Sequence, residues 1–395
     1  MPYKVYHPQS MKAKSISGSS TTAIKEAIAK SKTDGFIPTV AIVFISIKQD
    51  RNAVAEILNN EGIDILGATS CSEFINGHQS EGETVIMLLD MNRDNYTILF
   101  APVGDDTIKN TAAELSTAAL EKFTNPSLIT CSTGMNKKGE YFDGETFVRS
   151  LENNLGSDRI FFGGMAGDDW TFSGTYVFTN SQETDCGMVA LVIDTDKVSV
   201  GGMAITGWKP MGIVKKVTKS KGTLLYTIDD KPAIEMYFKY LGQTDKLEDK
   251  NFNIFKEIAI HYPLIVKRES GETILRSPMS IDHTESALVM DSEMKEGTEF
   301  WFTVPPDFDI AEEIIAEATQ LKNENMGHAD ALLIFSCAGR PPVLGPLVHA
   351  ENNGLADVWQ IPMAGYYSYG EYGRAKNGKQ EFHSGACCWV VLKEK

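Results

Sequence analysis

The sequence predicts an α/β protein with mixed β-sheets flanked by helices, in two associated halves that contain strand–helix–strand repeats. Short apolar runs alternate along the chain with amphipathic stretches of helical period, which is typical of crossover units. Several apolar runs end in Gly-rich polar segments, and α/β proteins build ligand pockets beyond such strand ends. The chain has 395 residues, 42% hydrophobic and 23% charged, which is enough for about two or three domains with cores of their own.

The first 34 residues are polar and poor in strand signals, so we expect an extension with one short helix at 22–30. The predicted N-terminal domain, 35–215, opens with a first cycle of elements. This cycle comprises a buried strand at 39–46, a helix at 50–60 with Asp50 as its cap, a strand at 63–66, the segment GATSCSEF at 67–74, and strands at 84–90 and 96–100.

A second cycle repeats this order in the same domain. It comprises a helix at 106–123, a strand at 127–131, a helix at 145–155, a strand at 159–162, the segment GGMAGDDW at 163–170 and a strand at 188–194. In both cycles Gly stands at the end of a strand and a carboxylate follows shortly after.

The predicted C-terminal domain, 216–395, begins after a turn-rich junction around 208–223. It starts with a hairpin-like stretch, a helix at 232–241 and short strands within 250–305. A third cycle follows, with a helix at 309–321, a strand at 331–335, the segment SCAGR, a helical segment at 343–352, a strand at 360–363, the segment GYYSYGEYG at 365–373 and a strand at 387–392. The three cycles suggest a duplicated unit, while the ordinary strand–Gly–helix pattern of α/β proteins is the alternative explanation.

Charge and targeting signals exclude some functions. The net charge of −16 argues against binding to a nucleic-acid backbone, which needs a basic face. No run of about 18 apolar residues and no apolar export segment is present, so we expect no membrane span and a cytoplasmic location. The six cysteines form no CxxC pair, so we expect free thiols and no metal site.

Six segments in order give the chain a family resemblance. They are GATSCSEF, FGGMAGDDW, the GW-x-P turn, TIDDKPAIEMYFKYLG, FSCAGR and GYYSYGEYG. Together they resemble the FIST domain, in its N-terminal and C-terminal halves, over roughly residues 35–393. The resemblance implies an intracellular sensory module that binds a small ligand, amino acids among the proposed ones, and one similar branch binds haem to sense nitric oxide.

The resemblance also implies an output partner. FIST domains occur alone or fused to kinases, chemoreceptor signalling regions or diguanylate cyclases. This sequence contains no histidine-kinase region, no helix-turn-helix and no long heptad repeat. We therefore expect the signal to pass to a separate protein such as a histidine kinase or a cyclase.

The expected ligand site centres on the third cycle. Arg340, after the strand at 331–335, could hold a ligand carboxylate through two parallel hydrogen bonds, and an ion pair with a neighbouring acidic residue is the alternative. Glu371 on the adjacent segment could bind an amino group, so that the pair would suit a zwitterion. The remaining expected contacts from the three Gly-rich segments and SCAGR are Ser336, Cys337, Tyr366, Ser368, Cys71, Glu73, Asp168 and Asp169.

Two other functions stay open. An enzyme would use Cys71 or Cys337 as a nucleophile, which needs a lowered thiol pKa and a base nearby. We favour inert pocket-lining thiols and no catalysis. A haem sensor would need an axial histidine, for which His261 and His283 in the insert are the candidates, although no haem motif is present and we predict no cofactor.

Overall fold

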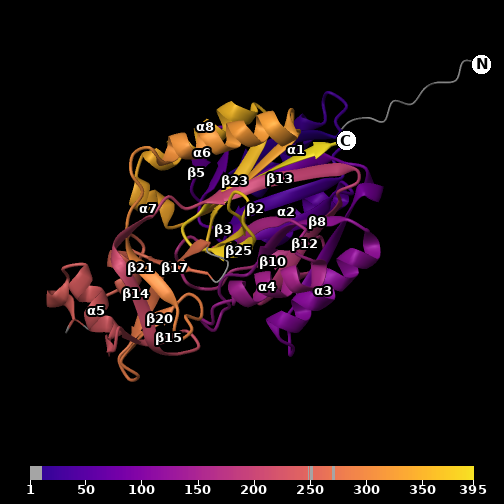
Figure 1. The fold of residues 1–395 in the computed structure, drawn as a ribbon. Helices are drawn as coiled ribbons and strands as arrows, with labels where there is room; N and C mark the ends of the chain where they lie inside the picture. The colour runs from indigo at the N-terminus through magenta and orange to yellow at the C-terminus, as the bar shows by residue number, and fades with distance from the viewer. Residues whose placement is uncertain (1–10, 248, 250–251, 269–271) are drawn as a thin grey trace, which may run out of the picture.

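The computed structural model describes residues 11–247, 249, 252–268 and 272–395. Within this part of the chain, the strands form three six-stranded sheets and one eight-stranded sheet. Helices pack on the outer faces of the six-stranded sheets (Figure 1). The predicted class, mixed sheets flanked by helices, is confirmed.

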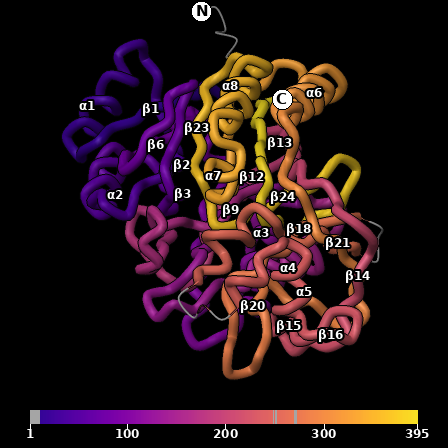
Figure 2. The backbone as a smooth tube through the Cα atoms, turned by 90° about the vertical axis from the view of Figure 1, so that its left-hand side faces the viewer, coloured from indigo at the N-terminus to yellow at the C-terminus, as the bar shows by residue number. Residues whose placement is uncertain are grey.

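The first repeat contains the complete set of elements. They are β1 (Lys12–Gly18), α1 (Thr21–Ser31), β2 (Val40–Ser46), α2 (Arg51–Asn60), β3 (Asp64–Ser70), β4 (Glu73–Ile75), β5 (His78–Ser80) and β6 (Thr84–Asp90). β2 and β3 are parallel, as a helical crossover requires, and β6 and β1 follow as antiparallel neighbours (Figure 2). The expectation of a strand-poor extension before residue 35 is wrong, because β1 pairs along its whole length with β6.

The second repeat has the same order of strands and helices. Its elements are β7 (Tyr96–Pro102), α3 (Ile108–Lys122), β8 (Pro126–Ser132), α4 (Gly144–Leu155), β9 (Phe161–Met165), β10 (Val177–Phe178), β11 (Glu183–Thr184) and β12 (Gly187–Asp194). β8 and β9 are parallel, β12 runs antiparallel to β8, and β7 forms the edge beside β12. The strand expected to close the first cycle, at 96–100, therefore opens the second repeat.

The third repeat is interrupted after its first strand. Its elements are β13 (Val198–Ile205), α6 (Ile310–Leu321), β22 (Ala331–Cys337), α7 (Arg340–Leu344), α8 (Leu347–Trp359), β23 (Met363–Ser368), β24 (Glu371–Arg374), β25 (Gln380–His383) and β26 (Cys387–Glu394). The pairing repeats again: β22 and β23 are parallel, β26 is antiparallel to β22, and β13 is the edge beside β26. The three cycles are thus structural repeats.

The segment from Lys209 to Val304, which we call the insert, stands between β13 and α6. Its elements are β14 (Lys209–Lys221), β15 (Leu224–Ile228), β16 (Lys231–Pro232), α5 (Ala233–Tyr240), β17 (Leu264–Lys267), β18 (Thr273–Arg276), β19 (Pro278–Asp282), β20 (Ala287–Met290) and β21 (Glu299–Val304). These strands form the eight-stranded sheet around a core of their own. The insert projects from one end of the molecule (Figure 1).

The short hairpin of each repeat pairs with the sheet of another repeat. β4 and β5 of the first repeat extend the sheet of the third through β23. β10 and β11 of the second extend the sheet of the first through β3, and β24 and β25 of the third extend the sheet of the second through β9. The three repeats are therefore linked in a closed cycle, and the two predicted halves interleave across the boundary at residues 215 and 216.

The three sheets enclose one common core. Alternate residues of the central strands face inward, for example Phe44 of β2, Ile129 of β8 and Phe335 of β22, and all three are fully buried. The intervening residues face the outer helices, as Val43 does towards α1 and α2. None of the helices in the described residues is both long and apolar enough to span a membrane.

Candidate functional site

A cavity of about 600 Å³ lies where the insert meets the carboxyl ends of strands from the second and third repeats. The second repeat contributes residues 134–143, after β8, and 165–172, after β9. The third contributes 337–339, after β22, and residues within 368–385, after β23. Trp208 and parts of the insert between 222 and 293 complete the wall. A cavity at the ends of parallel strands is the location that the Gly-rich segments predicted.

One wall of this cavity is a cluster of four aromatic rings. The ring centroid of Trp170 lies 5.7 Å from that of Tyr369 and 6.3 Å from that of Phe255 in the insert. Phe172 stacks on Tyr369 at 6.0 Å with an interplanar angle of 11°. The second repeat, the third repeat and the insert therefore meet in one apolar surface.

Asp168 fixes the loop that carries two of these rings. Its Oδ2 accepts hydrogen bonds from the backbone N–H groups of Ser173 (2.6 Å) and Gly174 (3.1 Å), and its Oδ1 accepts one from the Tyr369 hydroxyl. The loop needs this support because Trp170 and Phe172 have φ of 61° and 52°, a region that costs energy for bulky side chains. The bond to Tyr369 joins the strand ends of two repeats beside the cavity.

Glu73 and Glu371 occupy equivalent positions in the first and third repeats. Each accepts a hydrogen bond from the serine three residues earlier, Ser70 or Ser368. Each accepts a second bond from a backbone N–H just before the last strand of its repeat, at Glu83 (3.2 Å) or Ala386 (3.0 Å). Both side chains are fully buried, and burial raises the pKa of each carboxyl to about 8.

The polar side of the cavity comes from the insert. Asp291 Oδ2 accepts hydrogen bonds from the backbone N–H of Ser277 (2.9 Å) and from the hydroxyl of Ser384. Asp291 Oδ1 and the Ser292 hydroxyl are buried and have no hydrogen-bond partner among the described residues. Burial raises the pKa of the Asp291 carboxyl. Both atoms belong to residues of the cavity wall and remain unpaired within the described part of the chain.

Comparison with known families decides the relationship that the motifs suggested. The FIST N domain matches residues 39–231, and the FIST C domain matches residues 233–374. The chain belongs to the FIST family. FIST domains are associated with signal transduction and small-ligand sensing.

Comparison of this FIST protein with individual proteins gives a distant partial relative and low-scoring structural matches. An uncharacterized protein, MJ1623, from Methanocaldococcus jannaschii is 25% identical over 189 residues, which is 45% of this chain but only 35% of that protein. Among solved structures, T. maritima PurL complexed with ATP is 10% identical, with a TM-score of 0.21 over 97% of this chain and 71% of that one. PurL complexed with AMPPCP is 9% identical, also at a TM-score of 0.21, over 97% of this chain and 72% of the other. TM-scores this low do not establish a fold shared with this FIST protein.

Of the residues that the sequence predicted, Cys337 and Ser368 line the cavity. Asp168 supports its wall through Tyr369. Ser336, which is fully buried and whose hydroxyl has no hydrogen-bond partner in the described part of the chain, precedes Cys337 on β22. Glu371 lies behind the lining residue Ser368 and is hydrogen-bonded to it.

Arg340 is in a different situation from the one expected. It is fully buried, and its guanidinium binds Glu351 of α8 through Nε (3.0 Å) and Nη2. Its Nη1 donates to the backbone carbonyls of Thr206 (2.8 Å) and Gly385 (2.6 Å). The expected pairing of Arg340 with Glu371 across a ligand is wrong, because the crossover helix α8 supplies Glu351 as the partner.

The remaining predicted residues lie outside the cavity wall. Tyr366 is part of the common core of the three sheets, because GYYS continues β23 instead of forming its tip. Glu73 is buried beside Ser70, and Asp169 accepts a hydrogen bond from Ser46 (2.6 Å) in the first repeat. Cys71 is buried next to Gly167, so the strand ends of the first two repeats do meet.

The thiols and histidines do not favour the two alternative functions. Burial raises the pKa of Cys71 to about 12 and also raises that of Cys337, which disfavours a thiolate nucleophile. His261 and His283 are not among the described residues that line the cavity, and His283 is exposed on the β19–β20 turn.

Sequence reasoning missed the aromatic wall and the insert's polar groups. Trp170 ends a segment considered only for its carboxylates and Phe172 follows it, although two aromatics so close to a Gly-rich strand end are a usable signal. Asp291 and Ser292 lie in a region of short strands with no motif. Their position depends on how the insert packs against the repeats, which the local pattern does not encode.

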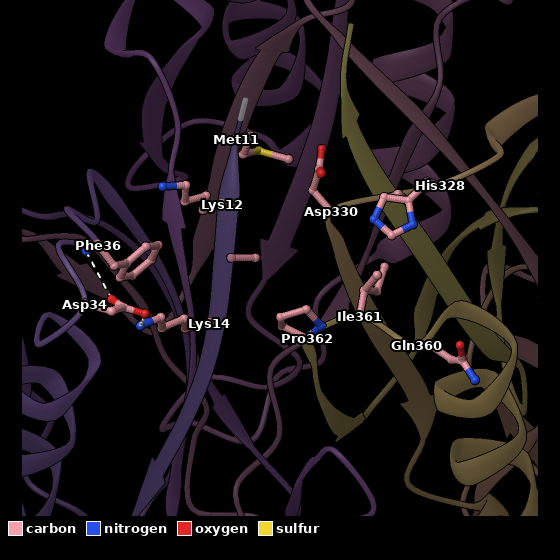
Figure 3. Close-up of a pocket in the computed structure, with 12 residues that line it drawn as sticks. Met11, Lys12, Lys14, Asp34, Phe36, His328, Asp330, Gln360, Ile361 and Pro362 are labelled. Carbon is pink, nitrogen blue, oxygen red and sulfur yellow. Dashed lines mark hydrogen bonds and ion pairs between the residues drawn. The ribbon is translucent and has the colours of Figure 1, made fainter. Parts of the chain in front are cut away.

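A second cavity of about 370 Å³ lies at the amino ends of β22 and β23 (Figure 3). Lys12 and Lys14 of β1 line one side, and residues 328–330 and 360–362 line the other. Lys14 is paired with Asp34 at 2.6 Å, and Asp34 also accepts a hydrogen bond from the Phe36 N–H. Lys14 and Asp34 thus neutralise each other, and this cavity is the weaker candidate.

Proposed function

We propose that this FIST protein is a cytoplasmic sensory module that binds a small polar metabolite in the larger cavity and signals through a separate protein. The observation that carries the proposal is that residues from two repeats and the insert line one cavity of about 600 Å³. Cavities of this size, apolar with a few polar groups, suit small molecules. Family membership supports small-ligand sensing and signal transduction.

The arrangement offers a route from binding to signalling. The insert has its own core and sheet, and it contacts the repeats around the cavity. A ligand that contacts the insert and both repeats binds more tightly when all three surround the cavity. It therefore shifts the population towards that arrangement by as much as its affinities for the two arrangements differ. The accessible change would be in how the insert packs on the repeats, and a partner such as a histidine kinase or a cyclase would detect that change.

A thermal-shift screen of amino acids, nucleotides and haem tests the proposal. A compound at 100 times its dissociation constant should stabilise the protein by about 2.7 kcal/mol. Thr223→Trp should abolish the shift, because Thr223 is exposed at the cavity wall and a larger ring there obstructs the cavity. Thr284→Trp, an exposed change on the same sheet, is the control and should leave the shift intact. A shift that survives Thr223→Trp and Asp291→Asn would place the ligand elsewhere.

A further inference from the structure

The charged residues of the larger cavity are all of one sign. Asp143, Asp291 and Glu293 line it, and none of the described lining residues is Lys, Arg or His. Asp143 is used as the cap of α4, where it binds the backbone N–H and the hydroxyl of Thr146. Glu293 is exposed at the rim. Asp291 is therefore the carboxylate that can meet a ligand inside the cavity.

Asp291 is held in position with one oxygen free. Its Oδ2 bonds to Ser277 and Ser384 fix the carboxyl group, while Oδ1 has no hydrogen-bond partner within the described residues. Ser292, 3% exposed, adds a second unpaired group next to it. A buried acceptor without a partner is costly, and a ligand donor that binds it recovers that cost.

Arg276 is the cation whose charge acts on Asp291, and its hydrogen bonds go to other groups. Arg276 is fully buried and lowers the cost of the Asp291 charge, but its guanidinium binds Glu145 at 2.7 Å and the carbonyls of Leu275 and Phe382. Glu145 also binds Arg268 at 2.9 Å. These arginines thus have carboxylate partners away from the cavity, and its own wall remains acidic.

The aromatic wall adds a second preference for positive charge. The faces of Trp, Tyr and Phe rings attract cations within about 6 Å. The cluster already attracts one cation of the protein, since the Lys256 ammonium lies 5.1 Å from the centroid of Phe172. Trp170 and Tyr369 are part of the cavity lining, where they can contact a ligand.

We infer that the cavity selects small organic cations, with an ammonium group at Asp291 and an apolar or aromatic body against Trp170, Phe172 and Tyr369. This rests on the proposed function, since it names the chemical class of that ligand. The site has a partner for an ammonium group but no basic residue on the described wall for a carboxylate. Amines should therefore bind better than the zwitterionic amino acids.

Three compounds with similar bodies test the charge preference on the unmodified protein. We expect 2-phenylethylamine to raise the melting temperature at a concentration at which 2-phenylethanol gives a smaller shift and 3-phenylpropionate gives none. Asp291→Asn keeps the shape and removes the charge, so it should weaken binding of the amine at least tenfold and leave 2-phenylethanol within about threefold. Glu285→Gln, at an exposed position on the β19–β20 turn and outside the described cavity lining, is the matched control and should change amine binding less than about threefold.

The outcomes separate this inference from the proposed function. Equal or stronger stabilisation by the neutral or anionic compound, abolished by Thr223→Trp, would overturn the cation preference while the cavity remained a ligand site. The cation preference would also be overturned if a compound of another class binds in the cavity while the amine does not. If no compound of any class stabilises the protein, both proposals fail.

Discussion

The ring of Phe178 in the second repeat lies directly over Gly67 in the first. The two residues are paired across β10 and β3, and a Cβ on Gly67 would lie 2.4 Å from two atoms of the ring. The same pairing recurs around the molecule, between Phe74 and Gly365 and between Tyr372 and Gly163. At Gly67 and Gly365 the glycine thus makes room for the aromatic ring of a neighbouring repeat.

This relationship predicts strong coupling between Gly67 and Phe178. Gly67→Ala should reduce the free energy of unfolding by about 1–3 kcal/mol, because the three atoms nearest to the added methyl all belong to the Phe178 ring. Phe178→Leu alone should cost up to about 1.5 kcal/mol. The double variant should be at least about 1 kcal/mol more stable than the sum of the two losses predicts, measured by urea denaturation. Additive losses would mean that the two repeats do not interlock there.

Arg340 and Glu351 should behave as a structural ion pair. Both are fully buried, so Arg340→Met leaves an unpaired carboxylate and should cost about 3–5 kcal/mol without any ligand. Arg340→Met/Glu351→Met should recover about 2 kcal/mol or more, although the carbonyls of Thr206 and Gly385 lose their donor. The measurement is chemical denaturation of both single variants and the double variant. A loss of ligand binding with unchanged stability would instead return Arg340 to the role of a ligand contact.

The buried carboxyls of Glu73 and Glu371 predict how stability changes with pH. Their pKa values, about 8, lie above the value of 4.5 for an unburied glutamate, so between these values the folded protein holds protons that the unfolded chain releases. Stability should therefore fall as pH rises from about 4.5 to about 8, by about 1.4 kcal/mol for each unit of pKa difference.

Glutamine at these positions removes the titration and keeps the shape. Glu371→Gln can still accept from the Ala386 N–H and donate to Ser368 Oγ, so the variant should gain relative to the wild type as pH rises through this window. Glu293→Gln, at an exposed position, is the control and should run parallel to the wild type. Parallel curves for Glu371→Gln as well would show that Glu371 does not carry a raised pKa.

Cysteine labelling tests whether the protein is a thiol enzyme. With its pKa at about 12, Cys71 should contain about a thousandfold less thiolate than an ordinary thiol of pKa 9, and Cys337 is shifted in the same direction. Both should react with iodoacetamide near pH 7 more slowly than the partly exposed Cys186, and all three should react at similar rates in urea. Peptide mass spectrometry follows each site separately. Faster labelling of Cys71 or Cys337 than of Cys186 in the native protein would support a nucleophile.

The sequence predicted the parts of the fold that depend on local pattern. The strand–helix–strand order, the capping of α2 by Asp50 and the repetition of the unit were all readable from the chain. β1 and β13 were missed because edge strands show only weak alternation. The Gly-rich segments proved to be partly strand, and Gly67 and Gly365 make room there for side chains of another repeat.

The site was predictable only in its position. Gly-rich strand ends indicated where a cavity would form, and Cys337 and Ser368 are indeed on its wall. The ligand-binding role expected for Arg340 was wrong, because its partner Glu351 lies on a helix whose orientation no local signal in the sequence predicts. Asp291 could not be found, since a residue of the insert reaches the cavity only through long-range packing.

Hydrogen exchange tests the central claim, that the larger cavity is the ligand site, most directly. The protein is incubated in deuterated buffer with and without a stabilising compound from the screen, and exchange is followed by peptide mass spectrometry. We predict slower exchange in all three parts of the wall, 134–143 with 165–172, 277–293, and 337–339 with 368–385, and loss of this protection in Thr223→Trp. Protection confined to residues around Lys12, Lys14 and Asp330 at the second cavity would contradict the claim.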